Sequence, residues 1–439
     1  MSGRALAPIT LALLVGFFAC FLFARPAMPS TTLPEGFTVD LVTGVPAPTA
    51  LAFTPGGRML VTSKPGQLRV YKEGAMLHTP ALDIGSRVCA NSERGLLGLA
   101  VDPDFANNGY IYLYYTFKKH NRCPQGDPGN RRNPVNRVSR FVMSGDTVDP
   151  ASEQVLIDNI PSPNGNHNAG DLHFGKDGYL YVSVGDGGCS GRKRCQYKNN
   201  AARERHTLLG KILRVEVINN SDGTSTTSIP EDNPFRGQNS ARCYDPAEGG
   251  NKSGRTARGD YCRETFAWGF RNPFRMAFDP DATTTRFFIN DVGGQRWEEI
   301  DEAEAGADYG WNLCEGLHDN PYRSGRVNCS GPTYTGPIHE YSHNTGCESI
   351  TGGAFVPDDG SWPVEYADSY LFGDFVCNRI FKLTPTGEGG FEETTFATDL
   401  GGGGPISMTF GPSETDEALY YTTFANGGEV HRIAYTGGS

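Results

Sequence analysis

The segment NGNHNAGDLHFGKDGYLYVSVGDGG, residues 164–188, contains the pattern that decides the fold. Within it, residues 172–182 read Leu-x-Phe-Gly-x-Asp-Gly-x-Leu-Tyr-Val, so alternating apolar residues flank a glycine turn. This pattern predicts a β-hairpin. His167 precedes the first strand and Asp186 follows the second, so the hairpin is expected to bring both to the same end of a sheet.

The pair His167 and Asp186 allows two interpretations. A histidine within reach of a carboxylate, with glycines that let a ligand approach the backbone, is the arrangement of a general base. A histidine in a loop can equally serve only to hydrogen-bond that loop. The hairpin alone does not choose between them.

The same strand, turn and strand pattern occurs six times along the chain. Each copy has an apolar strand, a turn with Pro, Gly or Asp, and a second strand rich in Tyr, Phe, Val and Ile. Such a repeat predicts an all-β protein, a six-bladed β-propeller with four-stranded units. The copies begin at Leu51, Leu99, Leu172, Met276, Gly353 and Met408.

The spacing of the copies predicts long loop insertions. Successive copies start 48 to 104 residues apart, whereas a bare blade needs about 40–50 residues. The polar stretch 192–263 is expected to be a surface excursion, and residues 313–344 form a second insertion. Because no interdomain linker is evident, residues 31–439 are expected to form one propeller domain.

Residues 1–30 have the features of a targeting segment. Arg4 precedes the apolar run 9–23, and small residues follow at 24–27. This pattern predicts a signal peptide or an N-terminal anchor. The protein is therefore expected to be exported, to the periplasm or outside the cell, with a membrane contact only through an uncleaved leader.

The cysteines agree with export. The chain has 11 cysteines, and setting Cys20 aside leaves an even number, which predicts disulfides in an exported protein. Pairing in sequence order is expected, because each neighbouring pair brackets an insertion rich in Gly, Asn or Arg. The cysteines are Cys89, Cys123, Cys189, Cys195, Cys243, Cys262, Cys314, Cys329, Cys347 and Cys377.

The net charge of -11 argues against a nucleic-acid partner or an anionic membrane surface, since both require clustered Lys and Arg. Small neutral ligands remain compatible with this composition.

Several motifs together resemble those of the glucose/sorbosone dehydrogenase family, over residues 33–433. Its characterised members are six-bladed propellers that oxidise sugars with pyrroloquinoline quinone and calcium. The resemblance therefore implies a small-molecule sugar substrate and an electron acceptor, and it favours a functional role for His167. The motifs are ERGLLGLAVDP at 93–103, residues 166–186, WGFRNP at 268–273, DVGGQRWEEI at 291–300 and DYGW at 308–311.

The resemblance also implies roles for individual residues. His167 would take the proton of the sugar's anomeric hydroxyl, while Asp186 would hold the imidazole in the right tautomer and stabilise its cation. Arg271 and Asn272 would contact the quinone oxygens, where a fixed cation stabilises developing charge. The alternative for Arg271 is that it caps strand carbonyls.

Calcium ligands are expected in the segment after Asp291. Calcium takes about six to eight oxygen ligands. The resemblance implies that Gly293 and Gly294 face a calcium shared with the quinone, and that Glu299 and the Tyr309 carbonyl bind a second calcium. The alternative is that the acidic residues 298–302 form a solvated blade edge.

The chain departs from the family where the quinone carboxylates would be held. Members that use the quinone have a Lys on the fifth blade and an Arg pair entering the sixth, but residues 371–381 offer only Arg379 and residues 400–410 offer no cation. Glu93 replaces the family's Gln and adds an anion. Carboxylates taken out of water need paired donors, and here the usual anchors of the quinone are missing. The residues expected to contact the cofactor are Glu93, Asn272 and Arg379.

Two other functions remain open on the sequence. The loss of the carboxylate anchors favours a non-catalytic extracellular propeller that binds a glycan or a protein. A calcium-dependent lactonase is a third possibility on a six-bladed propeller, but the sequence has no clear set of Asn, Asp and Glu ligands repeated across the blades.

Overall fold

The computed structural model describes residues 31–126, 130–188, 199–320, 326–387, 389–413 and 416–437. The leader expected at residues 1–30 and the expected Cys189–Cys195 pair lie outside the described residues.

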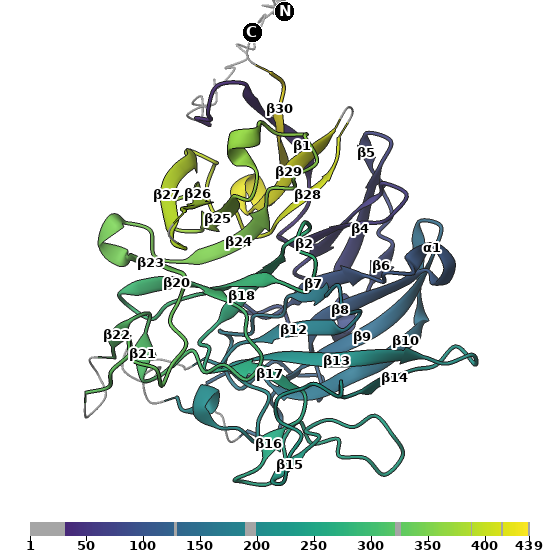
Figure 1. Ribbon diagram of the computed structural model, residues 1–439. Helices are drawn as coiled ribbons and strands as arrows, with labels where there is room; N and C mark the ends of the chain where they lie inside the picture. Colours follow the sequence, from purple (N-terminus) through teal and green to yellow (C-terminus); the bar gives the residue numbers. More distant parts are fainter. Residues whose placement is uncertain are drawn as a thin grey trace, which may run out of the picture.

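Six antiparallel sheets are arranged in a ring around one axis, as the repeats predict (Figure 1). Each sequence copy forms the two inner strands of one blade. The innermost strands of blades 1 to 6 are β2 (Pro48–Phe53), β7 (Leu96–Val101), β11 (Leu172–Phe174), β18 (Pro273–Phe278), β24 (Ile350–Phe355) and β28 (Met408–Pro412). The second strands are β3 (Met59–Ser63), β8 (Tyr110–Phe117), β12 (Leu180–Val184), β19 (Phe287–Asp291), β25 (Tyr370–Asp374) and β29 (Glu417–Thr423).

The outer strands complete the blades. The third strands are β4 (Gln67–Lys72), β9 (Val135–Ser144), β13 (Lys211–Asn219), β20 (Trp297–Glu302), β26 (Arg379–Pro385) and β30 (Glu429–Tyr435). The outermost positions hold β5 (Ala75–Met76), β10 (Thr147–Pro161), β14 (Ser225–Ser228), β23 (His339–Ser342), β27 (Phe391–Ala397) and β1 (Phe37–Gly44), with β6 (Leu82–Asp83) and β17 (Thr265–Trp268) as extra strands of blades 1 and 3. Outside the blades lie the short helix α1 (Phe105–Asn108) and the strands β15 (Ser240–Ala241), β16 (Tyr261–Cys262), β21 (Cys314–Glu315) and β22 (His318–Asp319).

The two ends of the described chain meet in blade 6. Strand β1 pairs antiparallel with β30, so that Phe37 lies opposite Tyr435. Blade 1 packs beside blade 6 through contacts of β2 with β28 and β29. The ring is therefore closed by a sheet that combines both ends of the chain, which leaves the innermost strands fixed around the axis.

The central hairpin of blade 3 has the register that its apolar alternation predicts. Leu172 lies opposite Val182 and Phe174 lies opposite Leu180. Leu172, Leu180 and Val182 are buried together in a core cluster that blades 2 and 3 share. Full burial of each such side chain stabilises the fold by about 1.5–3 kcal/mol, so the register is strongly specified.

The expectation that residues 192–263 are a surface excursion is wrong for part of this stretch. Residues 211–219 form β13, the third strand of blade 3, and 225–228 form β14. Ile212, Leu213 and Val215 of β13 are fully buried. The polar composition of the whole stretch concealed this short apolar run. Likewise, the expected insertion 313–344 contains β23, the outer strand of blade 4.

Disulfides join neighbouring cysteines along the chain, as expected for the described residues. The pairs are Cys89–Cys123, Cys243–Cys262, Cys314–Cys329 and Cys347–Cys377.

Removing the Cys89–Cys123 disulfide is expected to destabilise the protein. The two cysteines are 34 residues apart, and in the chain-entropy account a bridge closing such a loop contributes about 3–4 kcal/mol. Denaturant unfolding of the Cys89→Ser, Cys123→Ser double variant measures the loss in the free energy of unfolding. An unchanged free energy of unfolding would contradict this account, because the bridge would then not restrict the unfolded chain.

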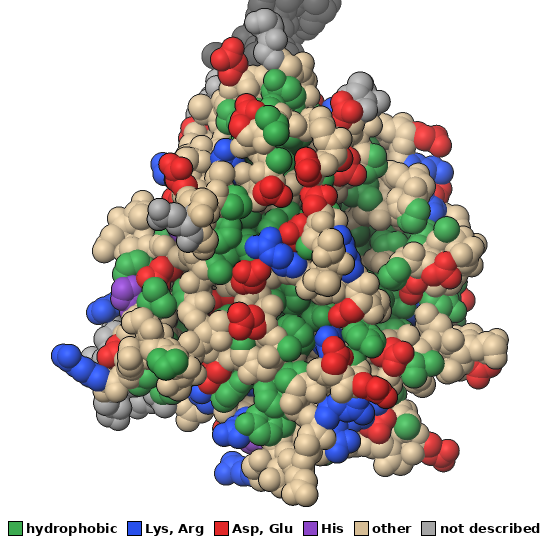
Figure 2. Space-filling view, viewed as in Figure 1, with side chains coloured by type: hydrophobic (Ala, Val, Ile, Leu, Met, Phe, Trp, Pro, Cys, Tyr) green, Lys and Arg blue, Asp and Glu red, His purple; other side chains and the backbone are tan. Residues whose placement is uncertain are grey.

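No helix among the described ranges is both long and apolar enough to cross a membrane. Figure 2 shows acidic and basic side chains interspersed over one face, as expected for a chain with 50 Asp and Glu against 39 Lys and Arg.

Candidate active site

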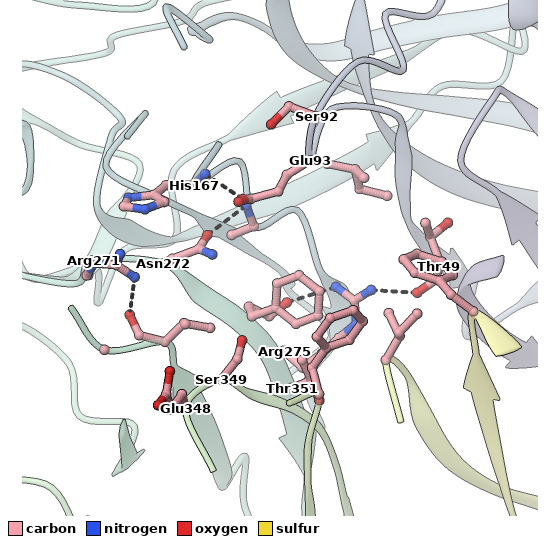
Figure 3. Close-up of a pocket in the computed structure, with 18 of the residues that line it drawn as sticks. Thr49, Ser92, Glu93, His167, Arg271, Asn272, Arg275, Glu348, Ser349 and Thr351 are labelled. Atoms are coloured by element: carbon pink, nitrogen blue, oxygen red, sulfur yellow. Dashed lines mark hydrogen bonds between the residues drawn. The ribbon is translucent and has the colours of Figure 1, made fainter. Parts of the chain in front are cut away.

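A cavity of about 370 Å³ lies where the blades meet, and every blade contributes to its lining. The lining combines charged and hydroxyl-bearing side chains with apolar ones (Figure 3). The residues are Thr49, Lys64, Ser92, Glu93, Leu97, His167, Ala169, Arg271, Asn272, Phe274, Arg275, Val292, Gly293, Gly294, Glu348, Ser349, Thr351, Phe375, Ile406 and Phe424.

His167 in the cavity lining and Asp186 behind it form a buried hydrogen-bonded pair. His167 Nδ1 lies 2.7 Å from Asp186 Oδ1, and the two side chains are only 5% and 0% exposed. Because Nδ1 faces the carboxylate, Nε2 is the ring nitrogen left to act on a molecule in the cavity, which His167 lines. The arrangement is that of an imidazole base oriented by a carboxylate.

Asp186 is itself held in place from several directions. Its Oδ2 accepts a hydrogen bond of 2.9 Å from Trp311 Nε1, and its Oδ1 also accepts one of 2.8 Å from the Gly188 N–H. Burial alone would raise the pKa of Asp186, but the His167 imidazole, the Arg271 guanidinium and the Gly188 N–H together hold that pKa below its ordinary value. Asp186 therefore stays ionised and can stabilise a protonated imidazole.

The backbone around His167 is constrained. His167 adopts a positive φ of 53°, a conformation that costs a non-glycine residue free energy and persists only where neighbours enforce it. The Glu93 carboxylate accepts a hydrogen bond of 2.7 Å from the His167 N–H. A Cβ at Gly185 would lie 2.3 Å from the His167 carbonyl oxygen, so this close approach requires glycine.

Arg271 and Asn272 are presented to the cavity by the turn before β18. Their N–H groups donate to the two oxygens of Asp291, at 2.9 and 2.6 Å. Arg271 Nη1 also donates to the Val292 carbonyl at 2.8 Å, and the Arg271 carbonyl accepts a hydrogen bond of 2.8 Å from the Asp186 N–H. The backbone thus joins Arg271 directly to the His167–Asp186 pair.

Behind Asp291 lies a cluster of three buried carboxylates, formed with Glu299 and Asp301. Oxygens of all three lie within 4.8 Å of one another. Glu299 Oε2 and both Asp301 oxygens are buried and have no hydrogen-bond partner among the described residues. Burial raises the pKa of all three acids, that of Asp291 to about 7, and repulsion from Asp291 raises the pKa of Glu299 and Asp301 further. Neither Glu299 nor Asp301 forms an ion pair within the described ranges, and the three acids fit a hard metal ion.

The other expected metal residues are placed differently. Gly293 and Gly294 line the cavity, and their N–H groups donate to Glu298 and Glu315 at 3.0 and 2.9 Å. Because calcium binds oxygen, their carbonyls are the backbone groups that could be ligands. Tyr309 is buried, and its hydroxyl donates to the Glu302 carbonyl at 2.5 Å. The acidic stretch is not a solvated edge at Glu299 and Asp301, which are buried.

Arg379 does not line the cavity. Its side chain is exposed at the start of β26. Blades 5 and 6 instead contribute Phe375, Ile406 and Phe424 to the lining.

Three residues of this site were not found by sequence reasoning. Trp311 donates a hydrogen bond to Asp186, 125 positions away in the sequence. The DYGW motif at 308–311 does not predict this contact. Lys64 and Arg275 both line the cavity. Arg275 lies within β18, where it looks like any polar residue of an alternating strand.

The family follows from a comparison with known proteins. The family model described as Glucose / Sorbosone dehydrogenase matches residues 45–244 and 250–402, which is more than half of the chain. The chain belongs to the glucose/sorbosone dehydrogenase family. The five motifs that resemble the family all lie within the matched residues. His167, Asp186, Arg271 and Asn272 lie there as well.

Several known proteins align with most of the chain. HIPL2 protein of Arabidopsis thaliana is 27% identical over 409 residues, covering 82% of this chain and 54% of that protein, so the chain spans about half of its length. Aldose sugar dehydrogenase YliI of Escherichia coli (strain K12) is 25% identical over 390 residues, covering 88% of this chain and 90% of that protein. The PQQ-bound aldose sugar dehydrogenase from Streptomyces coelicolor superposes with a TM-score of 0.61 at 21% identity, covering 92% of this chain and 99% of that one.

Proposed function

We propose that this protein oxidises the anomeric carbon of an aldose, or of an oligosaccharide end, with pyrroloquinoline quinone as the oxidant and calcium as a second cofactor. The observation that carries the proposal is the buried His167–Asp186 pair, at 2.7 Å, in the wall of a cavity that Arg271 and Asn272 also line.

His167 performs the proton transfer in this proposal. Its Nε2 takes the proton from the C1 hydroxyl while the C1 hydrogen leaves as hydride, so that the sugar becomes a lactone. Asp186 keeps the proton of the resting imidazole on Nδ1 and stabilises the imidazolium that forms. Trp311 fixes the Asp186 carboxylate through its 2.9 Å hydrogen bond.

The quinone, when bound, would supply the electrophile that accepts the hydride. The residues present fit such a group: Arg271 and Asn272 offer a cation and an amide to its oxygens, and Lys64 and Arg275 add two more cations to the lining. The Gly293 and Gly294 carbonyls would be ligands of a calcium in the cavity. Glu299, Asp301 and Asp291, with the Tyr309 carbonyl, would hold a second calcium, which the unpartnered buried oxygens support.

Reconstitution tests the proposal. Purified protein incubated with calcium and the quinone is expected to reduce an artificial dye when an aldose is added. Omitting the quinone or the aldose should abolish the signal. Saturable quinone binding without dye reduction by a panel of aldoses, oligosaccharides and uronic acids would contradict the proposed oxidation.

Replacing Trp311 is expected to weaken the base without removing it. Trp311→Phe keeps the ring but deletes the Nε1 donor, so one oxygen of the buried Asp186 loses its partner. Such a loss costs about 1–3 kcal/mol. Sugar oxidation should fall by about 10-fold to 100-fold at constant quinone affinity, measured by dye reduction and by quinone titration. Equal activity in the variant would show that Trp311 does not position Asp186.

A second candidate function is a non-catalytic propeller that binds a glycan or protein. It is supported by the part of the lining that comes from blades 5 and 6. Phe375, Ile406 and Phe424 lie there, and no described residue of these two blades contributes a cation to the lining. Absence of quinone binding in the presence of calcium would favour this candidate. For either function we propose export from the cytoplasm, which the four described disulfides support.

A further inference from the structure

Two cations of the cavity lack an acidic partner. Lys64 donates to the Ser92 carbonyl, and Arg275 donates to the carbonyls of Phe274 and Thr49 at 2.8 and 2.5 Å. Neither side chain forms an ion pair with any carboxylate of the described residues. The Glu93 carboxylate near Lys64 and the Asp171 carboxylate near Arg275 both lie beyond ion-pair distance, although their charges favour the two cations.

Arg275 is the more costly of the two to bury. It is 4% exposed, and its Nε has no hydrogen-bond partner among the residues described. Burial lowers the pKa of both Arg275 and Lys64, which shows how poorly the protein alone compensates their charge. A buried cation without a paired anion is destabilising, and an anionic ligand in the cavity would remove that penalty.

The position of Arg275 makes it available to a ligand. It extends from β18 of blade 4 to Thr49 on β2 of blade 1, across the axis of the ring. Figure 3 shows it on the Thr49 side of the cavity, apart from His167 and Arg271. Lys64 follows β3 of the same blade as Thr49 and lines the same cavity.

Blades 5 and 6 contribute apolar side chains to the lining. Phe375 and Phe424 from blades 5 and 6 meet edge to face with ring centroids 6.2 Å apart, and Ile406 lies in the same lining. Glu348 and Glu93 are exposed, so their charges are largely screened by solvent. A ligand would therefore place its acid group toward blades 1 and 4 and an uncharged face toward blades 5 and 6.

We propose that Lys64 and Arg275 form a carboxylate-binding subsite of the central cavity, so that the cavity takes a ligand bearing at least one carboxylate. This deepens the proposed function and rests on the same cavity. Two sources share this chemistry: the carboxylates of the quinone cofactor, held here by residues other than the family's usual anchors, and the carboxylate of a uronic acid substrate.

Calorimetric titration of the purified protein, with calcium and without any oxidation assay, tests the subsite. Pyrroloquinoline quinone, glucuronate and glucose are titrated separately into the parent protein and into Lys64→Gln and Arg275→Gln. The subsite predicts that one acid or both bind the parent, and that each variant weakens this binding by about 10-fold or more, since a hydrogen bond to a charged group contributes about 1.5–3 kcal/mol. Raising the salt concentration should weaken acid binding in the parent.

Matched controls separate the subsite from general charge effects. Arg69→Gln removes an arginine that, like Arg275, bonds to backbone carbonyls, but on blade 1 outside the lining. Lys176→Gln removes a lysine that bonds to the Pro280 carbonyl on the exposed surface. Both are expected to bind the acids as the parent does.

The outcomes decide between sources as well. Loss of quinone binding alone assigns the subsite to the cofactor, and loss of glucuronate binding alone assigns it to the substrate. Undiminished acid binding in folded Lys64→Gln and Arg275→Gln, or no acid binding by the parent, overturns the proposal. If Arg275→Gln does not fold, judged by circular dichroism, Lys64→Gln with the salt series decides. Acid binding that persists in a protein that oxidises no sugar would refute the proposed function and leave the subsite standing.

Discussion

His167→Ala is expected to lose sugar oxidation while keeping its fold and its affinity for the quinone. A positioned general base contributes about 10²-fold to 10⁴-fold to rate, and His167 is the one imidazole that lines the cavity among the described residues. The His167 ring is hydrogen-bonded to Asp186. In the variant Asp186 keeps its hydrogen bonds from Trp311 Nε1 and the Gly188 N–H, so the fold is expected to persist. Steady-state dye reduction with calcium and quinone present measures the loss.

Asp186→Asn should behave similarly for a different reason. An amide cannot stabilise the imidazolium, and its NH₂ group can face Nδ1 and move the remaining proton to Nε2, where the base must be free. His78→Ala, an exposed histidine outside the lining, should retain full activity. Oxidation by His167→Ala at a rate close to that of the parent would remove His167 from the mechanism.

Calcium is expected to raise the melting temperature of the protein strongly, and Asp301→Asn is expected to change that response. Without a cation, three buried carboxylates repel one another. Asn at 301 neither repels its neighbours nor has to take up a proton on folding, so in a chelator the variant should melt at a higher temperature than the parent. With calcium at about 100 times its dissociation constant the parent gains about 2.7 kcal/mol, and the variant, which lacks one ligand charge, should gain less.

The smaller calcium-induced rise in the melting temperature of Asp301→Asn distinguishes a metal site from simple repulsion between the carboxylates. Differential scanning calorimetry in chelator and in calcium gives all the values. Asp222→Asn, on the exposed turn between β13 and β14, serves as the control and should follow the parent in both conditions. If calcium stabilises the parent and Asp301→Asn equally, the cluster does not bind the ion.

The fold was predictable because its repeated unit is local. Each inner hairpin places alternating apolar residues within about twenty positions of sequence, and the registers, such as Leu172 opposite Val182, follow from that alternation. The third strand of blade 3 was missed because its buried residues, 212–215, stand inside a long polar stretch. A short apolar run with such neighbours gives too little periodicity to distinguish it from loop.

The site was predictable where one hairpin holds it. His167 and Asp186 flank the same hairpin, so their proximity follows from local pairing, whereas the roles expected of Arg271 and Asn272 came from the family motif. Contacts between blades depend on tertiary packing that the sequence does not display. The hydrogen bond from Trp311 to Asp186 and that from Arg275 to Thr49, 226 positions away, are of this kind.

Anaerobic mixing of the protein, loaded with calcium and quinone, with an aldose tests the central claim most directly. The absorbance of the oxidised quinone is followed in the parent and in His167→Ala, with aldose carrying hydrogen or deuterium at C1. We predict that the parent consumes the oxidised quinone, more slowly with deuterium, and that the variant does not. A quinone spectrum that the aldose leaves unchanged in the loaded parent protein would contradict the account.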